Sequence, residues 1–512
     1  MLLLCFLLIQ SSSGTRPAPF RPFGIPRGGT SSKSKNAEAD VYALVARVFQ
    51  DKFDDVSDGD QLTKALNRLA SSQQTFKGLD GAAHEAYQRT HAGNDISASV
   101  SGRAQRSAAR MAATAEALLA CELIELVQHP ELVNNETFVS RRVLLNSTNE
   151  TVTLENTNLS ILVLYEDSYT GGAGLEHGSI DDLTDDQRVR RPKGRLLIIL
   201  SDSVTNDLVQ TLKVLDKSPQ RVKLSSGLVS GEVVSVQPAL YKTAGDLLQV
   251  LEPLLRAHNT SAIHFVGQSL AGGVASLAAT ILDGTLPMPK LNSRKGKRRS
   301  KSNSRSKKTD EATLESSHAT LEPSNSTGTN ETVIIEPLNG LGSGRSSALT
   351  LGAPPCLSSN ILAAFCTSFM YGDDVVCRTS PESIERLYKR MDKHIHGGII
   401  GRNMGWMTDT VSLTVSNLKS HAHGSEGEEV KLSVPGRAYL VRPRRLGGIC
   451  SIHEVGNLKK GGREALRAGL LWQLYDILLS KSMWKHHELE SYIQGLDRVQ
   501  LRSTGEDAED HY

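Results

Sequence analysis

Residues 263–280 read IHFVGQSLAGGVASLAAT, and this stretch decides the fold. A short apolar run over 263–266 leads into a serine corner, Gly267-Gln268-Ser269, which continues into a segment rich in alanine and glycine. Unbroken apolar runs of this length are typical of strands that are buried on both faces of a parallel sheet. The stretch therefore predicts a strand, a sharp turn and a helix in direct succession.

The same alternation extends along the chain. Strand-like apolar runs occupy residues 152–154, 161–164, 195–200 and 348–351, and helical patterns lie between them, notably at 244–255. Strands that alternate with helices indicate an α/β fold with a mostly parallel sheet flanked by helices. Residues 38–128 instead read as helical throughout, because Leu62, Leu66 and Leu69 recur at helical spacing and an alanine-rich stretch runs from 104 to 127.

Composition excludes several classes of protein. The 512 residues are 39% apolar, enough for a sizeable core, and 58 basic against 56 acidic residues give no reason to expect nucleic-acid binding. Six cysteines are too few for a fold built on disulfides. No internal apolar run reaches the ~18 residues of a membrane span, so we expect no transmembrane helix in the mature chain. Nucleotide and metal motifs are also missing, so we expect no cofactor and no metal. The oligomeric state is left open.

The first 36 residues read as a targeting segment. The apolar start MLLLCFLLI precedes small polar residues, as in a secretory signal peptide, and residues 1–37 are basic, serine-rich and free of acidic residues, as in a transit peptide. We therefore expect the secretory pathway, with a plastid as the alternative. N-glycosylation sequons agree with the first expectation; they lie at Asn135, Asn146, Asn149, Asn158, Asn259, Asn325 and Asn330. Loss of Cys5 with the leader leaves an odd number of cysteines, so at least one is free or pairs with another chain.

The remaining chain divides into three parts. We expect a helical N-terminal region over 37–130, an α/β domain over 140–500 and a tail over 501–512. The domain is interrupted at about 285–346, where nine of the fifteen residues from Arg294 to Lys308 are basic and apolar residues are scarce. Such a stretch cannot bury enough area to offset its ordering entropy, which predicts a disordered insertion. The basic run is interpreted as a solvated loop, with a nuclear signal or an acidic-lipid patch as alternatives.

The serine corner indicates chemistry. A serine between small residues, on a sharp turn from a buried strand into a helix, is typical of a nucleophile elbow. There the strained turn presents the hydroxyl of Ser269, and the backbone N–H of Leu270 at the helix start would point into an oxyanion hole. An ordinary strand–helix turn is the alternative interpretation of the same residues.

Four further segments carry a resemblance to a known family. They are residues 351–356 (LGAPPC), 371–378 (YGDDVVCR), 434–441 (VPGRAYLV) and 480–487 (SKSMWKHH). Together with the serine corner they resemble, in order, the motifs of class 3 lipases of the α/β-hydrolase fold, especially the diacylglycerol-lipase-like branch. The resemblance covers roughly 140–285 and 347–500. Gln268, Ala271 and Cys377 stand where that family usually has His, Gly and Pro.

The resemblance and the chemistry together assign roles. Ser269 would be the nucleophile, Asp374 the acid that orients the base, with Asp373 as its alternative, and His487 the base. The order Ser, Asp, His is that of α/β hydrolases. Rival histidines are His453, His486 and the pairs His394/His396 and His421/His423, each pair being read as solvated loop residues and, alternatively, as the start of a metal site.

The second oxyanion donor departs furthest from the family. Class 3 lipases carry R-G-[TS] after the corresponding strand, whereas this chain has Ser201-Asp202-Ser203. Ser203 aligns with the hydroxyl residue, and Asp202 places a negative charge near a developing oxyanion. The resemblance implies a serine carboxylester hydrolase that cleaves glycerolipid esters at a membrane or droplet surface. The alternative is a catalytically impaired relative that binds lipid or a partner protein.

Overall fold

A computed structural model describes residues 33–50, 52–53, 59–73, 100–128, 141–147, 153–154, 157–167, 194–202, 207–224, 233–289, 338, 341–359, 361, 363–396, 432–443, 450–454 and 476–499. The chain forms two compact units, Met1–Val41 and Tyr42–Tyr512. Of the first, only the backbone from Lys33 onward is described, as the start of helix α2 (Lys33–Gln50). The expected tail, most of the leader and residues 74–99 lie outside the described residues.

The second unit has an α/β fold, and its main sheet contains both parallel and antiparallel strands. Among the described residues nine strands form it, in the order β1-β3-β4-β7-β8-β10-β12-β13, with β2 paired to β3. The five central strands are parallel, as predicted: β4 (Arg195–Asp202), β7 (Ala262–Gln268), β8 (Ser346–Leu351), β10 (Cys366–Tyr371) and β12 (Arg437–Pro443). Antiparallel strands complete its edges: β1 (Arg141–Ser147), β2 (Thr153–Leu154), β3 (Thr157–Glu166) and β13 (Cys450–Glu454).

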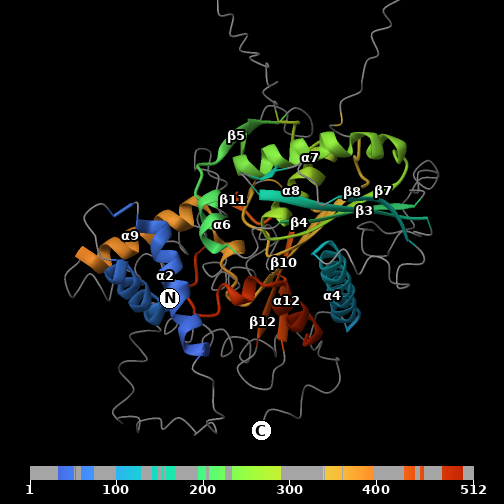
Figure 1. Ribbon diagram of the computed structural model, residues 1–512. Helices are drawn as coiled ribbons and strands as arrows, with labels where there is room; N and C mark the ends of the chain where they lie inside the picture. The colour runs from blue at the N-terminus through green and yellow to red at the C-terminus, as the bar shows by residue number, and fades with distance from the viewer. Residues whose placement is uncertain are drawn as a thin grey trace, which may run out of the picture. The chain divides into compact units, whose positions relative to one another are not determined.

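Helices cover both faces of this sheet (Figure 1). Helices α7 (Pro238–Ala257) and α8 (Ser269–Leu282) lie on one face, and every residue of α8 is buried. Helices α4 (Val100–Gln128) and α12 (Leu489–Asp497) lie on the other, where Ile124 and Leu496 pack with Ile199, Val266 and Phe369. The unbroken apolar strands follow from this arrangement, because both faces of each central strand are covered.

Smaller elements surround the core. A second sheet pairs β11 (Leu432–Ser433), β9 (Leu357–Ser358), β6 (Val233–Val236) and β5 (Gln220–Lys223). Helix α6 (Leu208–Leu215) begins where the Asp207 carboxylate accepts the Gln210 N–H, which is the usual role of an N-cap aspartate. Helix α9 (Pro381–His396) follows β10, and residues 59–73 form a further helix in the predicted N-terminal helical region. None of the described helices is long and apolar enough to cross a membrane.

Two predicted boundaries need correction. Helix α2 begins at Lys33, four residues inside the segment that was read as a leader. The insertion expected over 285–346 is shorter at both ends, because Leu286 is fully buried and β8 begins at Ser346. Burial of Leu286 contributes apolar area to the core, which the basic stretch further along cannot do. The basic run at 294–308 lies outside the described residues.

Candidate active site

Ser269 lies at the corner between β7 and α8. Its φ is +57°, and no other non-glycine residue in the described part of the chain has a positive φ. A non-glycine residue held there stores about 1–3 kcal/mol of strain, which the surrounding structure must offset. Gly267 permits the turn, since a Cβ at that position would lie 2.8 Å from the carbonyl oxygen of Ala271. The predicted sharp strand–turn–helix is therefore present.

Asp374 and His487 form a buried pair. The Nδ1 atom of His487 lies 3.0 Å from both carboxylate oxygens of Asp374, although the two residues are 113 positions apart. Their side chains are 0% and 1% exposed. His487 ends the 3-10 turn η7 (Lys485–His487), and Asp374 follows β10 just before η5 (Val376–Arg378). Next to a carboxylate, Nδ1 carries the proton, so Nε2 is the basic nitrogen of the ring.

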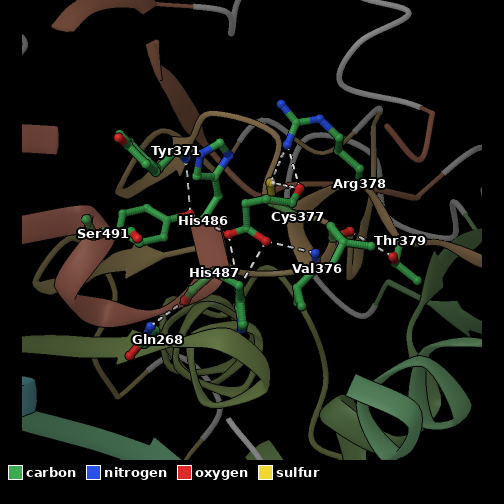
Figure 2. A network of polar contacts seen from close by, with 12 residues as sticks. Gln268, Tyr371, Val376, Cys377, Arg378, Thr379, His486, His487 and Ser491 are labelled. Atoms are coloured by element: carbon green, nitrogen blue, oxygen red, sulfur yellow. Dashed lines mark hydrogen bonds and ion pairs between the residues drawn. The ribbon is translucent and has the colours of Figure 1, made fainter. Parts of the chain in front are cut away.

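Further hydrogen bonds hold the Asp374 carboxylate in place. Figure 2 shows the surrounding network, in which Val376, Arg378 and His487 are labelled. The Val376 N–H donates to Oδ1 at 2.8 Å, and the Tyr492 hydroxyl donates to Oδ2 at 2.5 Å. The buried Arg378 side chain donates to the carbonyl oxygens of Asp374 and Gly372. Burial, and then the charge of Asp374, raises the pKa of the Tyr492 hydroxyl well above its ordinary value. Tyr492 therefore stays neutral and acts as a donor to the carboxylate.

The serine corner is joined to the loop that carries His487. The side-chain amide of Gln268 donates to the carbonyl oxygen of His487 at 2.9 Å. Ser269 Oγ and His487 Nε2 are both buried, and neither has a hydrogen-bond partner among the described residues. Both atoms are therefore unengaged, and the Gln268 hydrogen bond joins the corner that carries Ser269 to the loop that carries His487.

Gly352 lies at the centre of this arrangement. It follows β8, whose Leu351 pairs with Gln268 across the sheet, and its φ is +60°. A Cβ there would lie 2.6 Å from Asp374 Oδ2 and 3.1 Å from His487 Nδ1. The glycine is therefore needed both for its backbone conformation and for the space in which the acid and the base meet.

The oxyanion side has a different character. Leu270, which the sequence predicted as an oxyanion donor, is fully buried at the start of α8. The next backbone N–H, that of Ala271, donates to Asp202 Oδ2 at 2.9 Å. The first N–H groups of a helix have no intrahelical acceptor and carry partial positive charge, so an anion binds there favourably. Ser203, the predicted second donor, lies outside the described residues.

The rival residues take other positions. Asp373 donates its backbone N–H to Nδ1 of His486, a half-buried ring that packs edge-on against Tyr371. His396 contacts Asp392 one helical turn away, and no group of three His, Cys, Asp or Glu residues in the described parts could hold a metal ion. The side chain of His453 and residues 421 and 423 lie outside those parts.

The five cysteines in the described part of the chain are buried and free. Burial raises the pKa of the Cys121 and Cys366 thiols to about 12 and also raises that of Cys377, which donates to the carbonyl oxygen of Asp374. These thiols are therefore unreactive in the folded chain. In the described structure they serve as small core residues.

Sequence reasoning missed three contributors to the site. Tyr492 was not singled out as a site residue, Gln268 was read only as a departure from a motif, and Gly352 only as part of the resemblance over 351–356. Their roles depend on contacts with residues more than 100 positions away, for which a single sequence gives no direct signal. Comparisons with protein-family models, curated proteins and solved structures found no match.

Proposed function

We propose that the protein is a serine carboxylester hydrolase of the α/β-hydrolase fold, which cleaves acyl esters of glycerolipids. One observation carries the proposal: a serine strained to φ +57° at a strand–helix corner is tied through Gln268 to a loop whose histidine is paired with a buried aspartate. This combination supports Ser269 as the nucleophile, His487 as its base and Asp374 as the group that orients the base.

The proposed reaction uses these residues in sequence. His487 Nε2 takes the proton of Ser269 as the hydroxyl attacks the ester carbonyl, and Asp374 stabilises the imidazolium that forms. Collapse of the tetrahedral intermediate expels the alcohol, which receives the proton from His487. Water, activated by the same imidazole, then hydrolyses the acyl-enzyme. Because Ser269 is 0% exposed, an ester reaches it only after covering side chains move.

The lipid part of the proposal rests on the motif resemblance, since the triad itself serves many acyl-transfer reactions. It is tested with the full chain on a water-soluble short-chain ester and on dispersed diacylglycerol, triacylglycerol and a polar glycerolipid. We expect fatty-acid release from a dispersed lipid and none from Ser269→Ala. Cleavage of the soluble ester alone would reject the lipid substrate but keep the hydrolase.

A second candidate function is favoured by Asp202. A carboxylate bound to the start of α8 opposes the negative charge that develops there in the transition state, and loss of one oxyanion donor costs about 10²–10³ in rate. In a catalytically impaired protein that binds lipid, the Asp202 carboxylate at the start of α8 would stand beside an otherwise complete Asp374–His487 pair. Lipid binding by the wild type and by Ser269→Ala, with no ester cleavage by either, would establish this alternative.

A further inference from the structure

The chain that leads to the catalytic loop is buried without regular secondary structure. Residues 476–480 are all buried, and Leu479 is 0% exposed. Buried backbone groups need hydrogen-bond partners, and an irregular segment cannot supply them from itself. His487 lies only a few residues further on, after a turn in which Met483 N–H donates to Ser480 O. Whatever fixes residues 477–480 therefore also sets the starting point of the His487 loop.

Gln73 supplies the missing partners from the N-terminal helical region. Its side chain is 2% exposed, and its amide N–H donates to Ile477 O at 3.0 Å. The amide oxygen of the same side chain accepts the Leu479 N–H at 2.8 Å. The two contacted residues are two positions apart, so the amide bonds the segment as a neighbouring β-strand would.

The helical region also contacts the loop of the acid. Val45, Val48 and Phe49 of α2 line one small apolar cavity together with Ile477 and with Val375, the residue that follows Asp374. The N–H of Val375 donates to the carbonyl oxygen of Met483, which joins the acid loop to the base loop. Burial, and then the charge of Asp373, raises the pKa of the Tyr42 hydroxyl, so this side chain lies close to the same loop.

We infer that the segments 42–50 and 59–73 are a positioning element for the Asp374–His487 pair, with Gln73 as the residue that fixes the base loop. The inference rests on the proposed function. It gives the N-terminal helices a role inside the site, because they contact both loops that carry the acid and the base. Misplacement of a catalytic group by ~1 Å through a distant substitution can cost about 100-fold in rate.

The test uses the full chain and three variants. Gln73→Leu removes both hydrogen bonds, Gln73→Glu keeps the acceptor for Leu479 N–H, and Asn67→Leu is the matched control. Asn67 lies on the same helix, is exposed, and donates its amide only to Thr63 O in its own helix. Two quantities are measured: the rate at which a fluorophosphonate probe labels Ser269, and the low-field proton resonance of the His487 Nδ1–H bonded to Asp374.

We expect Gln73→Leu to label about 10- to 100-fold more slowly than the wild type and to lose the low-field resonance, while Asn67→Leu keeps both. For Gln73→Glu, the ratio of variant to wild-type labelling should rise as the pH falls, because a protonated carboxyl regains the donor to Ile477 O. A merely structural role would not produce this pH-dependent ratio.

Each outcome is decisive. A folded Gln73→Leu that labels at the wild-type rate and keeps the resonance would overturn the inference. If Gln73→Leu does not fold, Gln73→Glu decides instead, and a ratio that stays flat with pH overturns it. A wild type that shows the resonance but is never labelled would reject the proposed function, while loss of the resonance in Gln73→Leu would still support the positioning role.

Discussion

The two sides of Ser269 treat negative charge in opposite ways. On the acid–base side, the Asp374 carboxylate is bonded by His487, Val376 and Tyr492 and is fully buried. On the oxyanion side, a second carboxylate, Asp202, accepts a backbone N–H at the start of α8. In the proposed reaction, the first anion prepares the base for proton transfer, whereas the second lies at the helix start where that reaction would create an anion. The difference teaches that a complete acid–base pair does not by itself set the rate.

The largest effect is expected from breaking the acid–base side. Asp374→Asn should lower the rate of ester cleavage by about 10⁴-fold, because an amide does not hold His487 in the required tautomer. Asp373→Asn, the matched control one residue away, should lower it by less than about tenfold. The rates are measured on a soluble ester at saturation. Equal losses for both variants would remove the assignment of Asp374 as the orienting acid.

The next effect tests the space in which the pair meets. Gly352→Ala places a Cβ 2.6 Å from Asp374 Oδ2, so we expect a loss of about 100-fold in rate from misplaced catalytic groups. Gly344 is the control, since its φ of +69° is similar but a Cβ there would meet nothing within 4 Å. Thermal unfolding of both variants separates backbone strain from the clash. An active Gly352→Ala would show that the Asp374–His487 pair leaves more space at Gly352 than the structure gives.

Tyr492→Phe removes one donor from the carboxylate and should slow ester cleavage about tenfold, as expected for loss of ~1.4 kcal/mol. Tyr241→Phe is the control, because that hydroxyl donates to Pro287 O, away from the site. The raised pKa of Tyr492 also predicts in which direction the stability of the fold changes with pH. The folded state keeps this proton, so its stabilising contribution is complete below pH ~10, where a free tyrosine titrates, and is lost above it.

Chemical unfolding at pH 8 and pH 11 checks that direction. The wild type should lose more stability between the two values than Tyr492→Phe does. A Tyr492→Phe variant with the same pH dependence as the wild type would contradict the buried, protonated hydroxyl.

The smallest effect, and the only gain, is expected on the oxyanion side. Asp202→Asn keeps an oxygen that can accept the Ala271 N–H but removes the charge, so ester cleavage should become about three- to tenfold faster. Asp207→Asn removes the same charge at the start of α6 and keeps its cap, so it should leave the rate unchanged. A slower Asp202→Asn would mean that the carboxylate supports the reaction. The proposed difference between the acid–base side and the oxyanion side would then be wrong.

Sequence reasoning predicted the local part of this site better than the distant part. The Ser269 corner depends on Gly267 and on neighbours within the same stretch, so the local sequence is enough to predict its geometry. Asp374 was preferred over Asp373, and His487 over His486, by their positions within the matching motifs, and the structure brings the preferred two together. The links through Gln268, Gly352 and Tyr492 depend on the packing of β8, η7 and α12, which one sequence does not specify.

The fold shows the same division. Apolar runs predicted β4, β7 and β8, three of the five parallel strands, because burial on both faces leaves a continuous signal. The ends of the 285–346 insertion were misplaced because Leu286 is a single apolar residue, and its burial depends on contacts far away along the chain. The contact between Gln73 and residues 477 and 479, about 400 positions away, lay beyond any local pattern.

The most direct test of the account is to label the full chain with a fluorophosphonate probe and to map the modified residue by peptide mass spectrometry. We expect a single adduct on Ser269, formed by the folded wild type and absent from Ser269→Ala. A folded wild type that gives no adduct, or a Ser269→Ala variant that is labelled equally well, would contradict it.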